Sequence, residues 1–444
     1  MIDRFSSWVS RVRVPVVGGR PLAVRPTVSA WLVMIIALYW GYESYDRNFQ
    51  PDWVALSWNP GSNHGANFRS YRHAAELALD SQQFYDVAPP GLDDWAVFLY
   101  PPITTVVYYP FTLLEWMTGY LILGGMNVLA GFVAAVVIVR FIERKMGSLG
   151  WVDVGLMTAL FTLSPFSFGT MYYGNINILL ALALIIGFVA MEDDRETMAG
   201  IAFGLAALWK VFPALIGIWL LWRRSWRAIA TAIGIGGGGL IAGLIVYGWE
   251  TTHYYFVEVL FGRTDTLRFV GGYPADGTYY ITLQRPLSHL IWFGWPGAPA
   301  ELLLPATLVV AVALIAPFYY RLDDHFDVLI AIFATVIITV TVIPALQWYI
   351  VLLFFPMLPL LYLWNGPGRI PFVLGAIVLF FNARPGNIVE TIEEIDLPNF
   401  MSVVLTWLFS VATVQLYAIV LMLGACAYWK YSARLSVNWH VVNR

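Results

Sequence analysis

The sequence predicts an all-α membrane protein whose chain crosses the bilayer many times. Of its 444 residues, 59% are hydrophobic and only 12% are charged. A soluble domain carries about a quarter charged residues, so this composition excludes a soluble enzyme. The apolar residues form long runs separated by short polar stretches, which is typical of a bundle of membrane helices.

Charge and cysteine content exclude several other classes of function. The net charge is -3, so the chain carries no basic footprint for nucleic acid, and we expect no nucleic-acid partner. The single cysteine, Cys426, lies in an apolar run, which leaves no disulfide and no cysteine-based metal site. The Arg-rich start leads directly into an apolar segment, so we also expect no signal peptide.

Twelve stretches are apolar enough to span or partly span a bilayer, which takes about 20 helical residues. They are 28–44, 98–116, 119–140, 152–170, 175–191, 199–222, 228–248, 301–320, 328–344, 349–364, 370–382 and 402–429. Several are short, so we expect strongly tilted or partly inserted helices among them. The sequence thus predicts a bundle of about 10–12 membrane segments.

Lys and Arg residues near the ends of these stretches predict their orientation. Five arginines and one acid precede the first stretch, so we expect the N-terminus in the cytoplasm. The loop at 45–95 holds three basic and seven acidic residues, which predicts an outward position. The basic C-terminus again favours the cytoplasm, and the compact loops fit a prokaryotic plasma membrane.

The chain is therefore expected to divide into five parts. They are a cytoplasmic Arg-rich tail at 1–27, a core module at 28–248, an extracytoplasmic loop at 249–300, C-terminal membrane helices at 301–429 and a cytoplasmic tail at 430–444. The core module includes the outward loop at 45–95, and a further outward loop is expected at 382–401.

Two basic clusters conflict with a simple alternation of spans. Arg140, Arg144 and Lys145 favour the cytoplasm, and so do Arg223, Arg224 and Arg227. Both can lie there only if 98–116 and 199–222 each enter and leave the same face or lie along it. Lys210 and Pro213 interrupt the second segment and leave two halves too short to cross. Because broken helices at membrane depth line protein cavities, we predict such an interruption at 199–222.

Two motifs mark the outward loop and the segment after it. Residues 67–76 have the pattern of an amphipathic helix capped by Asn67, with Phe68 and Tyr71 on its apolar face. The motif Tyr100-Pro101-Pro102 predicts an extended backbone before the next apolar segment. Taken alone, each motif is also explained by ordinary structure, as a juxtamembrane helix and as a proline break.

Two further motifs offer polar groups within apolar surroundings. The segment at 173–177 follows Ser164-Pro165 and carries Asn175 and Asn177, whose amides can bind sugar hydroxyls or cap the next helix. Lys210 sits in the middle of an apolar stretch, where a charge costs about 2.5–3.5 kcal/mol and needs a counter-ion or a watery cavity. A cation facing a cavity suits a phosphate. The glycine run at 234–239 lies inside an apolar stretch and predicts close helix packing rather than a nucleotide site.

In order and spacing, these motifs resemble glycosyltransferase family 87, the polyprenyl-phosphate-mannose-dependent mannosyltransferases of the GT-C class. The family shows Asp-Phe-x-x-Tyr-x-x-Ala-Ala after the first span, then Tyr-Pro-Pro, Ser-Pro, Gly-Gln-x-Asn and a Gly-rich helix leading to Lys-x-x-Pro and a basic loop. The matching residues are Phe68, Tyr71, Ala74, Ala75, Tyr100, Pro101, Pro102, Ser164, Pro165, Gly174, Asn177, Gly200, Gly204, Lys210, Pro213, Arg223 and Arg224. The resemblance covers most of 28–240, and 344–351 looks like the family's later Pro-x-x-Trp-x-His-Tyr segment.

The resemblance implies a GT-C bundle with outward juxtamembrane helices and an extracytoplasmic active site. The donor would be a hexose, mannose in this family, on a polyprenyl or dolichyl phosphate, and no cofactor or metal would be needed. The acceptor would be a hydroxyl of a glycan or glycolipid, which would attack the anomeric carbon of the donor sugar and invert its configuration while the lipid phosphate leaves. The substrate-binding residues would be Tyr71, Tyr100, Asn175, Asn177, Lys210, Gln347, Trp348 and Tyr349.

The chain departs from the family at the two positions associated with acid–base chemistry. The family's catalytic aspartate falls on Asn67, and an amide cannot accept a proton as a base. The histidine of the later segment falls on Trp348. General-base assistance is worth about 10²–10⁴-fold in rate, so this loss requires a replacement if the protein is an active enzyme.

Three interpretations follow from these departures. In the first, which we favour, another group on the outward loop is the base, and the candidates are Asp52, His64 and His73. In the second, the chain binds the lipid-linked sugar without transferring it and acts as a binding or assembly partner. In the third, it transports a lipid or solute, although the sequence shows no inverted repeat and few intramembrane charges.

Overall fold

The computed structural model describes residues 16–17, 20–21, 26–48, 63–262, 280–320, 322, 324–342, 345–381, 388, 392, 394 and 398–442. The first half of this chain comprises β1 (Val16–Val17), β2 (Arg20–Pro21), α2 (Pro26–Asn48), α4 (Ala66–Leu79), η2 (Pro102–Tyr108), α5 (Tyr109–Thr112), α6 (Trp116–Met146), α7 (Trp151–Leu163), α8 (Pro165–Tyr172), α9 (Asn177–Glu192), α10 (Glu196–Trp209), η3 (Phe212–Ile216), α11 (Gly217–Arg223), α12 (Trp226–Tyr254) and η4 (Tyr255–Phe261). The second half comprises β3 (Tyr280–Ile281), α14 (Gln284–Gly294), η5 (Ala300–Leu302), α15 (Leu303–Tyr319), α16 (His325–Thr341), β4 (Ala345–Leu346), η6 (Gln347–Leu353), α17 (Phe354–Leu363), α18 (Arg369–Leu379), α20 (Asn399–Val411) and α21 (Val414–Val442).

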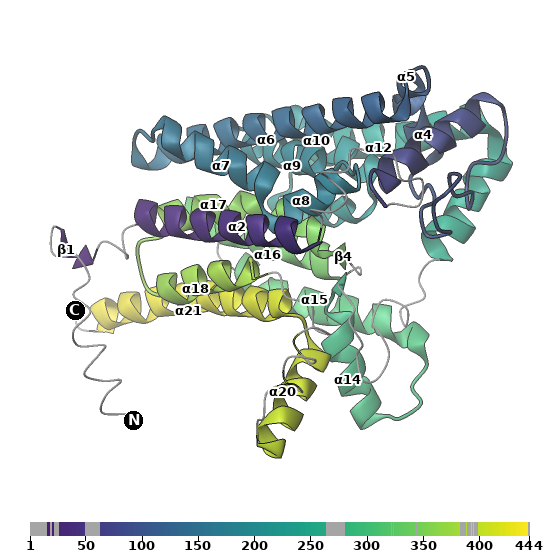
Figure 1. Ribbon diagram of the computed structural model, residues 1–444. Coiled ribbons are helices and arrows are strands. Elements are labelled where there is room, and N and C mark those ends of the chain that lie inside the picture. Colours follow the sequence, from purple (N-terminus) through teal and green to yellow (C-terminus); the bar gives the residue numbers. More distant parts are fainter. Residues whose placement is uncertain are drawn as a thin grey trace.

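The described chain is a helical bundle, which confirms the predicted all-α fold class. Long helices run side by side in Figure 1, and α2 begins at the same end of the bundle at which α21 finishes. The helix α4 lies at the opposite end. The strands are two residues long, and they pair antiparallel as β1 with β2 and β3 with β4.

Most of the apolar helices are too short to cross a membrane unaided. By length and composition, two can do so alone: Trp116–Met146, and Trp226–Phe261, which joins α12 to η4. The bent pairs α7–α8 and α20–α21, with bends of 52° and 78°, raise this number to four if each pair is one span. Seven further apolar helices have 10–17 residues. The short apolar runs of the sequence therefore fold as short or broken helices in the described part of the chain.

The predicted membrane segment at 98–116 contains no long helix. It forms η2 and α5, which together cover only eleven residues from Pro102 to Thr112. Pro101, Pro102 and Pro110 fix backbone angles and remove donors, so a regular helix cannot extend through this segment. The segment packs along α4 and α12 instead of forming a regular span of its own.

The segment at 199–222 is interrupted where the sequence predicted. The helix α10 ends at Trp209 because Lys210 takes an extended conformation, with φ -136° and ψ 125°. After η3, α11 runs back to the end at which α9 finishes, where Arg223 Nη2 donates to the carbonyl oxygen of Met191 at 2.9 Å. We call residues 196–223 the lysine hairpin, because its two ends meet at one end of the bundle and Lys210 lies at its turn.

Glycines allow the lysine hairpin to pack closely on α12. A Cβ at Gly200 would lie 2.5 Å from the carbonyl oxygen of Ala228, and one at Gly204 would lie 2.9 Å from that of Ala232. Within the 234–239 run, a Cβ at Gly239 would lie 2.4 Å from a methyl carbon of Leu208. The predicted close packing is therefore right for Gly239, but it is wrong for the three glycines of the run with nothing within 4 Å of a Cβ, which are Gly234, Gly237 and Gly238.

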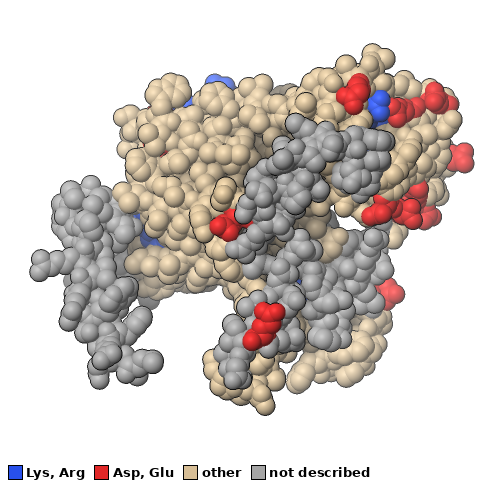
Figure 2. All heavy atoms as spheres, viewed as in Figure 1, with Lys and Arg blue, Asp and Glu red and all other residues tan. Residues whose placement is uncertain are grey.

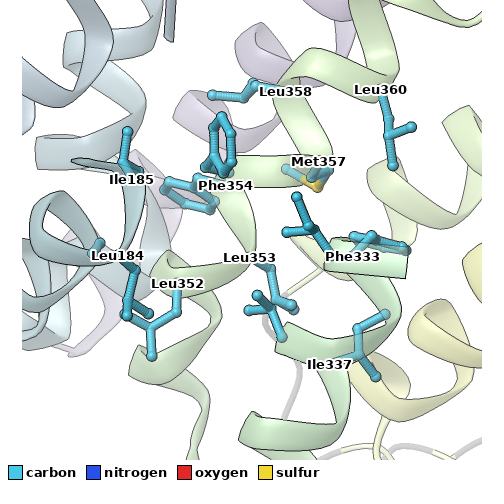
Figure 3. Packing of buried hydrophobic residues seen from close by; sticks show 14 of the residues in the cluster. Leu184, Ile185, Phe333, Ile337, Leu352, Leu353, Phe354, Met357, Leu358 and Leu360 are labelled. Carbon is cyan, nitrogen blue, oxygen red and sulfur yellow. The ribbon is translucent and has the colours of Figure 1, made fainter. Parts of the chain in front are cut away.

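A continuous apolar core joins the two halves of the chain. Figure 3 shows side chains from α9, α16, η6 and α17, including Leu184, Phe333 and Leu353, packed against one another. The helix α16 is apolar all round, and every residue from Leu329 to Thr341 is buried in this core. The buried carboxylate of Asp153 accepts from Trp31 Nε1 at 2.7 Å and Tyr362 Oη at 2.6 Å, and it thereby links α2, α7 and α17.

A second, aromatic core supports α4 and the segment after it. It contains Phe68 and Tyr71 of α4 together with Phe84, Phe98 and Tyr108. In Figure 2, acidic side chains gather at the end of the molecule where α4 lies. This distribution suits a bundle that is embedded in lipid and has a polar module at one end.

Candidate active site

Lys210 is the centre of a buried polar cluster at the turn of the lysine hairpin. Its side chain is 5% exposed, and Nζ donates to Asn177 Oδ1 at 2.7 Å, Tyr349 Oη at 2.9 Å and Asn175 Oδ1 at 3.2 Å. All three acceptors are uncharged. No carboxylate of the described chain lies within ion-pair distance of this ammonium. A buried cation without a counter-ion favours the binding of an anion beside it.

Two tyrosine rings add to the stabilisation of this cation. Nζ lies 4.4 Å from the ring centroid of Tyr349 and 5.6 Å from that of Tyr100. Both distances are within the range of cation–π attraction. Tyr100 Oη is 2.9 Å from Tyr71 Oη, so α4 is connected directly to the lysine cluster. Burial and the neighbouring phenols raise the pKa of Tyr71 well above its usual value, so this hydroxyl stays protonated.

The two asparagines are fixed by the turn between α8 and α9. Gly174 has φ +66°, and a Cβ there would lie 2.7 Å from Cβ of Phe68, so only glycine fits. The carbonyl oxygen of Asn175 accepts from Asn127 Nδ2 at 2.9 Å, and Asn177 Nδ2 donates to Thr170 Oγ1 at 3.3 Å. Asn175 Oδ1 also accepts from the backbone N–H of Ile176, so the residue acts in the turn and in the cluster at once.

Positions 67 and 348, where the resemblance places acid–base residues, meet at Tyr173. The backbone N–H of Asn67 donates to the carbonyl oxygen of Tyr173 at 2.8 Å. The Trp348 ring stacks on the Tyr173 ring, with centroids 4.4 Å apart. A Cβ at Gly169 would lie 2.5 Å from Trp348 Nε1, so glycine makes room for this indole. The contacts join α4, the α8–α9 turn and η6 into one wall.

Comparison with known proteins assigns this arrangement to a family. Residues 98–344, more than half of the chain, match Glycosyltransferase family 87. The chain belongs to this family. The resemblance inferred from the motifs is therefore confirmed. The matched region contains Lys210 and its neighbours Tyr100, Asn175 and Asn177, whereas Tyr71 and Tyr349 of η6 lie outside it.

Two mycobacterial proteins are similar to this chain, and their descriptions name a reaction. The chain is 30% identical over 252 residues to a protein of Mycolicibacterium smegmatis, covering 54% of this chain and 57% of the relative. It is 27% identical over 285 residues to one of Mycobacterium tuberculosis, covering 61% of each. Both are described as polyprenol-phosphate-mannose-dependent alpha-(1-2)-phosphatidylinositol pentamannoside mannosyltransferases. The chain thus spans about three fifths of the length of these relatives.

Of the three bases proposed from the sequence, the structure describes two, His64 and His73. His64 is buried with Nε2 3.0 Å from Tyr120 Oη. Because the Tyr120 hydroxyl donates to the Met171 carbonyl oxygen, that histidine nitrogen acts as the donor in their contact and cannot itself accept a proton. His73 lies 3.5 Å from Glu76 on the half-exposed side of α4. Asp52 is outside the described residues.

Gln347 and Asn67 are the remaining residues of the candidate site. Gln347 is 8% exposed, and its Oε1 has no hydrogen-bond partner among the described residues, so it can accept a hydrogen bond from a ligand hydroxyl. The Asn67 side chain is half-buried at the start of α4. In the described ranges, no group of three or more His, Cys, Asp or Glu residues is placed to hold a metal ion.

An apolar groove adjoins the lysine cluster. It has a volume of about 530 Å³ and lies between the lysine hairpin and α12. Pro101 and Val211, which line it, directly follow Tyr100 and Lys210 of the cluster in the chain. The rest of the lining is almost entirely apolar and includes two glycines of the α12 run, Gly236 and Gly237. The sequence did not indicate this groove, the role of Gly169 or the pairing of Tyr173 with Trp348, because each depends on contacts between distant segments.

Proposed function

We propose that the protein transfers a mannosyl residue from a polyprenyl or dolichyl phosphate to a hydroxyl of an extracytoplasmic glycan or glycolipid, with inversion at the anomeric carbon. The observation that carries this proposal is the buried Lys210 ammonium, which has only uncharged partners and adjoins an apolar groove. A lipid monophosphate has the matching chemistry, because it joins an anionic head to a long hydrocarbon chain.

In the proposed reaction the protein stabilises the leaving group and forms no covalent bond to the sugar. The acceptor hydroxyl oxygen attacks the anomeric carbon while the bond from that carbon to the phosphate oxygen breaks. Negative charge then grows on the departing lipid phosphate, and Lys210, held by Asn175 and Asn177, is placed to stabilise it. Tyr71, Tyr100 and Gln347 are expected to orient the sugar.

The proton of the acceptor hydroxyl must go to a base that Asn67 cannot provide. His64 and His73 are already engaged with Tyr120 and Glu76. Asp52 remains from the candidates and precedes α4 in the same outward loop, so we assign the base to Asp52. The stacked pair of Tyr173 and Trp348 would form an apolar wall beside the acceptor.

The proposed orientation has the site outside and both termini in the cytoplasm of a plasma membrane. Two observations support it. The end of the bundle at which α2 begins and α21 finishes is opposite to the end that carries α4 and the acidic residues (Figures 1 and 2). Arg140, Arg144 and Arg223 all lie near helix ends on the former side, as the positive-inside rule requires.

The departures at Asn67 and Trp348 favour a second candidate, a protein that binds the lipid-linked sugar without transferring it. The test is to incubate the full chain in lipid vesicles with polyprenyl-phosphate mannose and a mannosylated phosphatidylinositol, the acceptor class named in the mycobacterial relatives. We expect stoichiometric release of polyprenyl phosphate and a lengthened glycolipid. Donor binding without release would establish the binder, and donor movement across the bilayer without consumption would establish a transporter.

Filling the apolar groove is expected to weaken the use of long-chain donors. Gly237 lines the groove, and a Cβ there meets nothing within 4 Å, so we choose Gly237→Leu to reduce the space in the groove. We expect KM for a long polyprenyl donor to rise about tenfold, since apolar burial of the chain is lost, while a short-chain donor is unaffected. Gly238→Leu is the matched control, because it is equally open but does not line the groove. Equal kinetics in the two variants would place the lipid chain elsewhere.

A further inference from the structure

A second hollow lies at the base of the lysine hairpin, far from Lys210. It has a volume of about 770 Å³ and lies between the first turns of α10 and the turn that leads into α12. Three arginines line it, Arg195, Arg224 and Arg227, together with Thr197 and Trp226. Since α10 has 14 residues, the hollow is about 20 Å from the lysine cluster. The proposed sugar transfer makes no use of it.

The arginines of this hollow differ from their neighbours at the same end of the bundle. Arg140 lies 3.0 Å from Glu143, Arg144 pairs with Asp193, and Arg223 lies 3.5 Å from Glu192. By contrast, Arg195, Arg224 and Arg227 have no acid within ion-pair distance anywhere in the described ranges. The positive-inside rule explains why arginines occur here, but it does not require three unpaired guanidinium groups around one hollow.

Two acids also line the hollow, but they do not cancel the positive charge of its arginines. Asp194 lies 3.8 Å from Arg223, which is outside the lining, and Glu196 is in the first turn of α10. Three arginines against these two acids leave a positive hollow. The first turns of α10 and α12 add to this potential, because neither helix has a side-chain cap at its N-terminus.

The surroundings of the hollow suit a position at the level of lipid headgroups. Trp222 and Trp226 are 52% and 63% exposed, and Leu221 beside them is 53% exposed. Exposed tryptophans at the ends of apolar helices mark the membrane interface, and basic pockets between such helices on the cytoplasmic side bind anionic headgroups. Guanidinium groups suit phosphate because they donate two parallel hydrogen bonds.

We propose that the hollow binds the phosphate of an anionic phospholipid in the cytoplasmic leaflet. The headgroup would contact Arg195 at the start of the lysine hairpin and both Arg224 and Arg227 after its end. Bound in this way, it would tie the two ends of the hairpin together and so steady the turn that carries Lys210. The inference rests on the orientation proposed above but not on sugar transfer, because the ligand and the residues are different.

The test compares lipids on the purified full-length protein in detergent. Phosphatidylglycerol and phosphatidylcholine are added separately, and binding is measured by native mass spectrometry and by the thermal unfolding midpoint. We expect phosphatidylglycerol to bind and to raise the midpoint, and we expect Arg224→Gln with Arg227→Gln to weaken this binding about tenfold or more. The control, Arg140→Gln with Arg144→Gln, removes two charges at the same end and should leave phosphatidylglycerol binding unchanged.

Two further arms make the outcome decisive. Arg227→Gln alone, measured in parallel, is expected to lose part of the same affinity and serves if the double variant does not fold. Inorganic phosphate is titrated against the protein, and protection by phosphate equal to that by phosphatidylglycerol would assign the hollow to a soluble anion and overturn the lipid proposal. Equal loss of phosphatidylglycerol binding in the 140/144 control would also overturn it, because general charge would then explain the effect.

Discussion

Lys210→Met is expected to reduce donor-dependent turnover by at least about 100-fold, the cost of removing one preorganised group that stabilises a leaving oxyanion. Methionine preserves most of the volume but removes the ammonium that Asn175, Asn177 and Tyr349 hold in place. The affinity for polyprenyl phosphate should fall as well, because the product phosphate loses its cation. Turnover is measured as release of lipid phosphate, and affinity is measured by titration of the unlabelled product.

The chain supplies a matched control for this experiment. Lys430 is also 5% exposed, and its Nζ donates to the Phe318 carbonyl oxygen at 2.6 Å and lies 3.6 Å from Asp327 Oδ1. Lys430→Met therefore removes a buried ammonium from a structural contact between α15, α16 and α21, and it should lower stability while product affinity is retained. Product affinity that is unchanged by Lys210→Met would count against both the transferase and the binder.

In an Asp52→Asn background, which lacks the assigned base, Asn67→Asp is expected to raise turnover by a factor approaching the 10²–10⁴ that general-base assistance provides. The substitution restores a carboxylate at the start of α4, where the backbone N–H of residue 67 is already held by Tyr173. The measurement is kcat at saturating donor across pH. Because a base must be deprotonated, the gain should be present above the pKa of the new carboxyl, about 3.9 when unperturbed, and should fall as pH drops below it.

Two further variants test which group accepts the proton. Asn67→Ala should leave turnover near the wild-type level if the amide takes no part in proton transfer. Asp52→Asn should abolish wild-type activity but be tolerated in the Asn67→Asp background, since the new carboxylate then replaces the assigned base. If neither the wild-type chain nor the Asn67→Asp variant turns over the donor while donor binding is normal, the rest of the site is not competent and the chain is a binder.

The sequence could predict those parts of the candidate site whose chemistry is unusual for their surroundings. A lysine amid apolar residues, with a proline three residues later, predicted the break between α10 and η3 and its position. Tyr71, Tyr100, Asn175, Asn177 and Tyr349 were expected near that lysine from the family resemblance, and the structure brings all of them into one hydrogen-bonded or cation–π cluster. Whether they bind substrate stays a prediction.

Other features could not be predicted, because they arise from packing between remote segments. The stacking of Trp348 on Tyr173 and the space that Gly169 leaves for it join residues more than 170 positions apart. The engagement of His64 with Tyr120 has the same origin, and neither residue signals it locally. The lengths of the helices were also difficult to predict. In the apolar run at 98–116, only the prolines indicate that the elements are short and bent.

The lysine hairpin has a consequence for how relatives of this protein are aligned and counted. Since α10 and α11 depart from and return to one side, the pair adds nothing to the parity of crossings. Under the proposed orientation, a count that scores 199–222 as a full crossing would reverse the assigned direction of the described helices from α12 to α21. A homologue in which the two arms of the hairpin are equally longer or shorter would keep the orientation of its other helices.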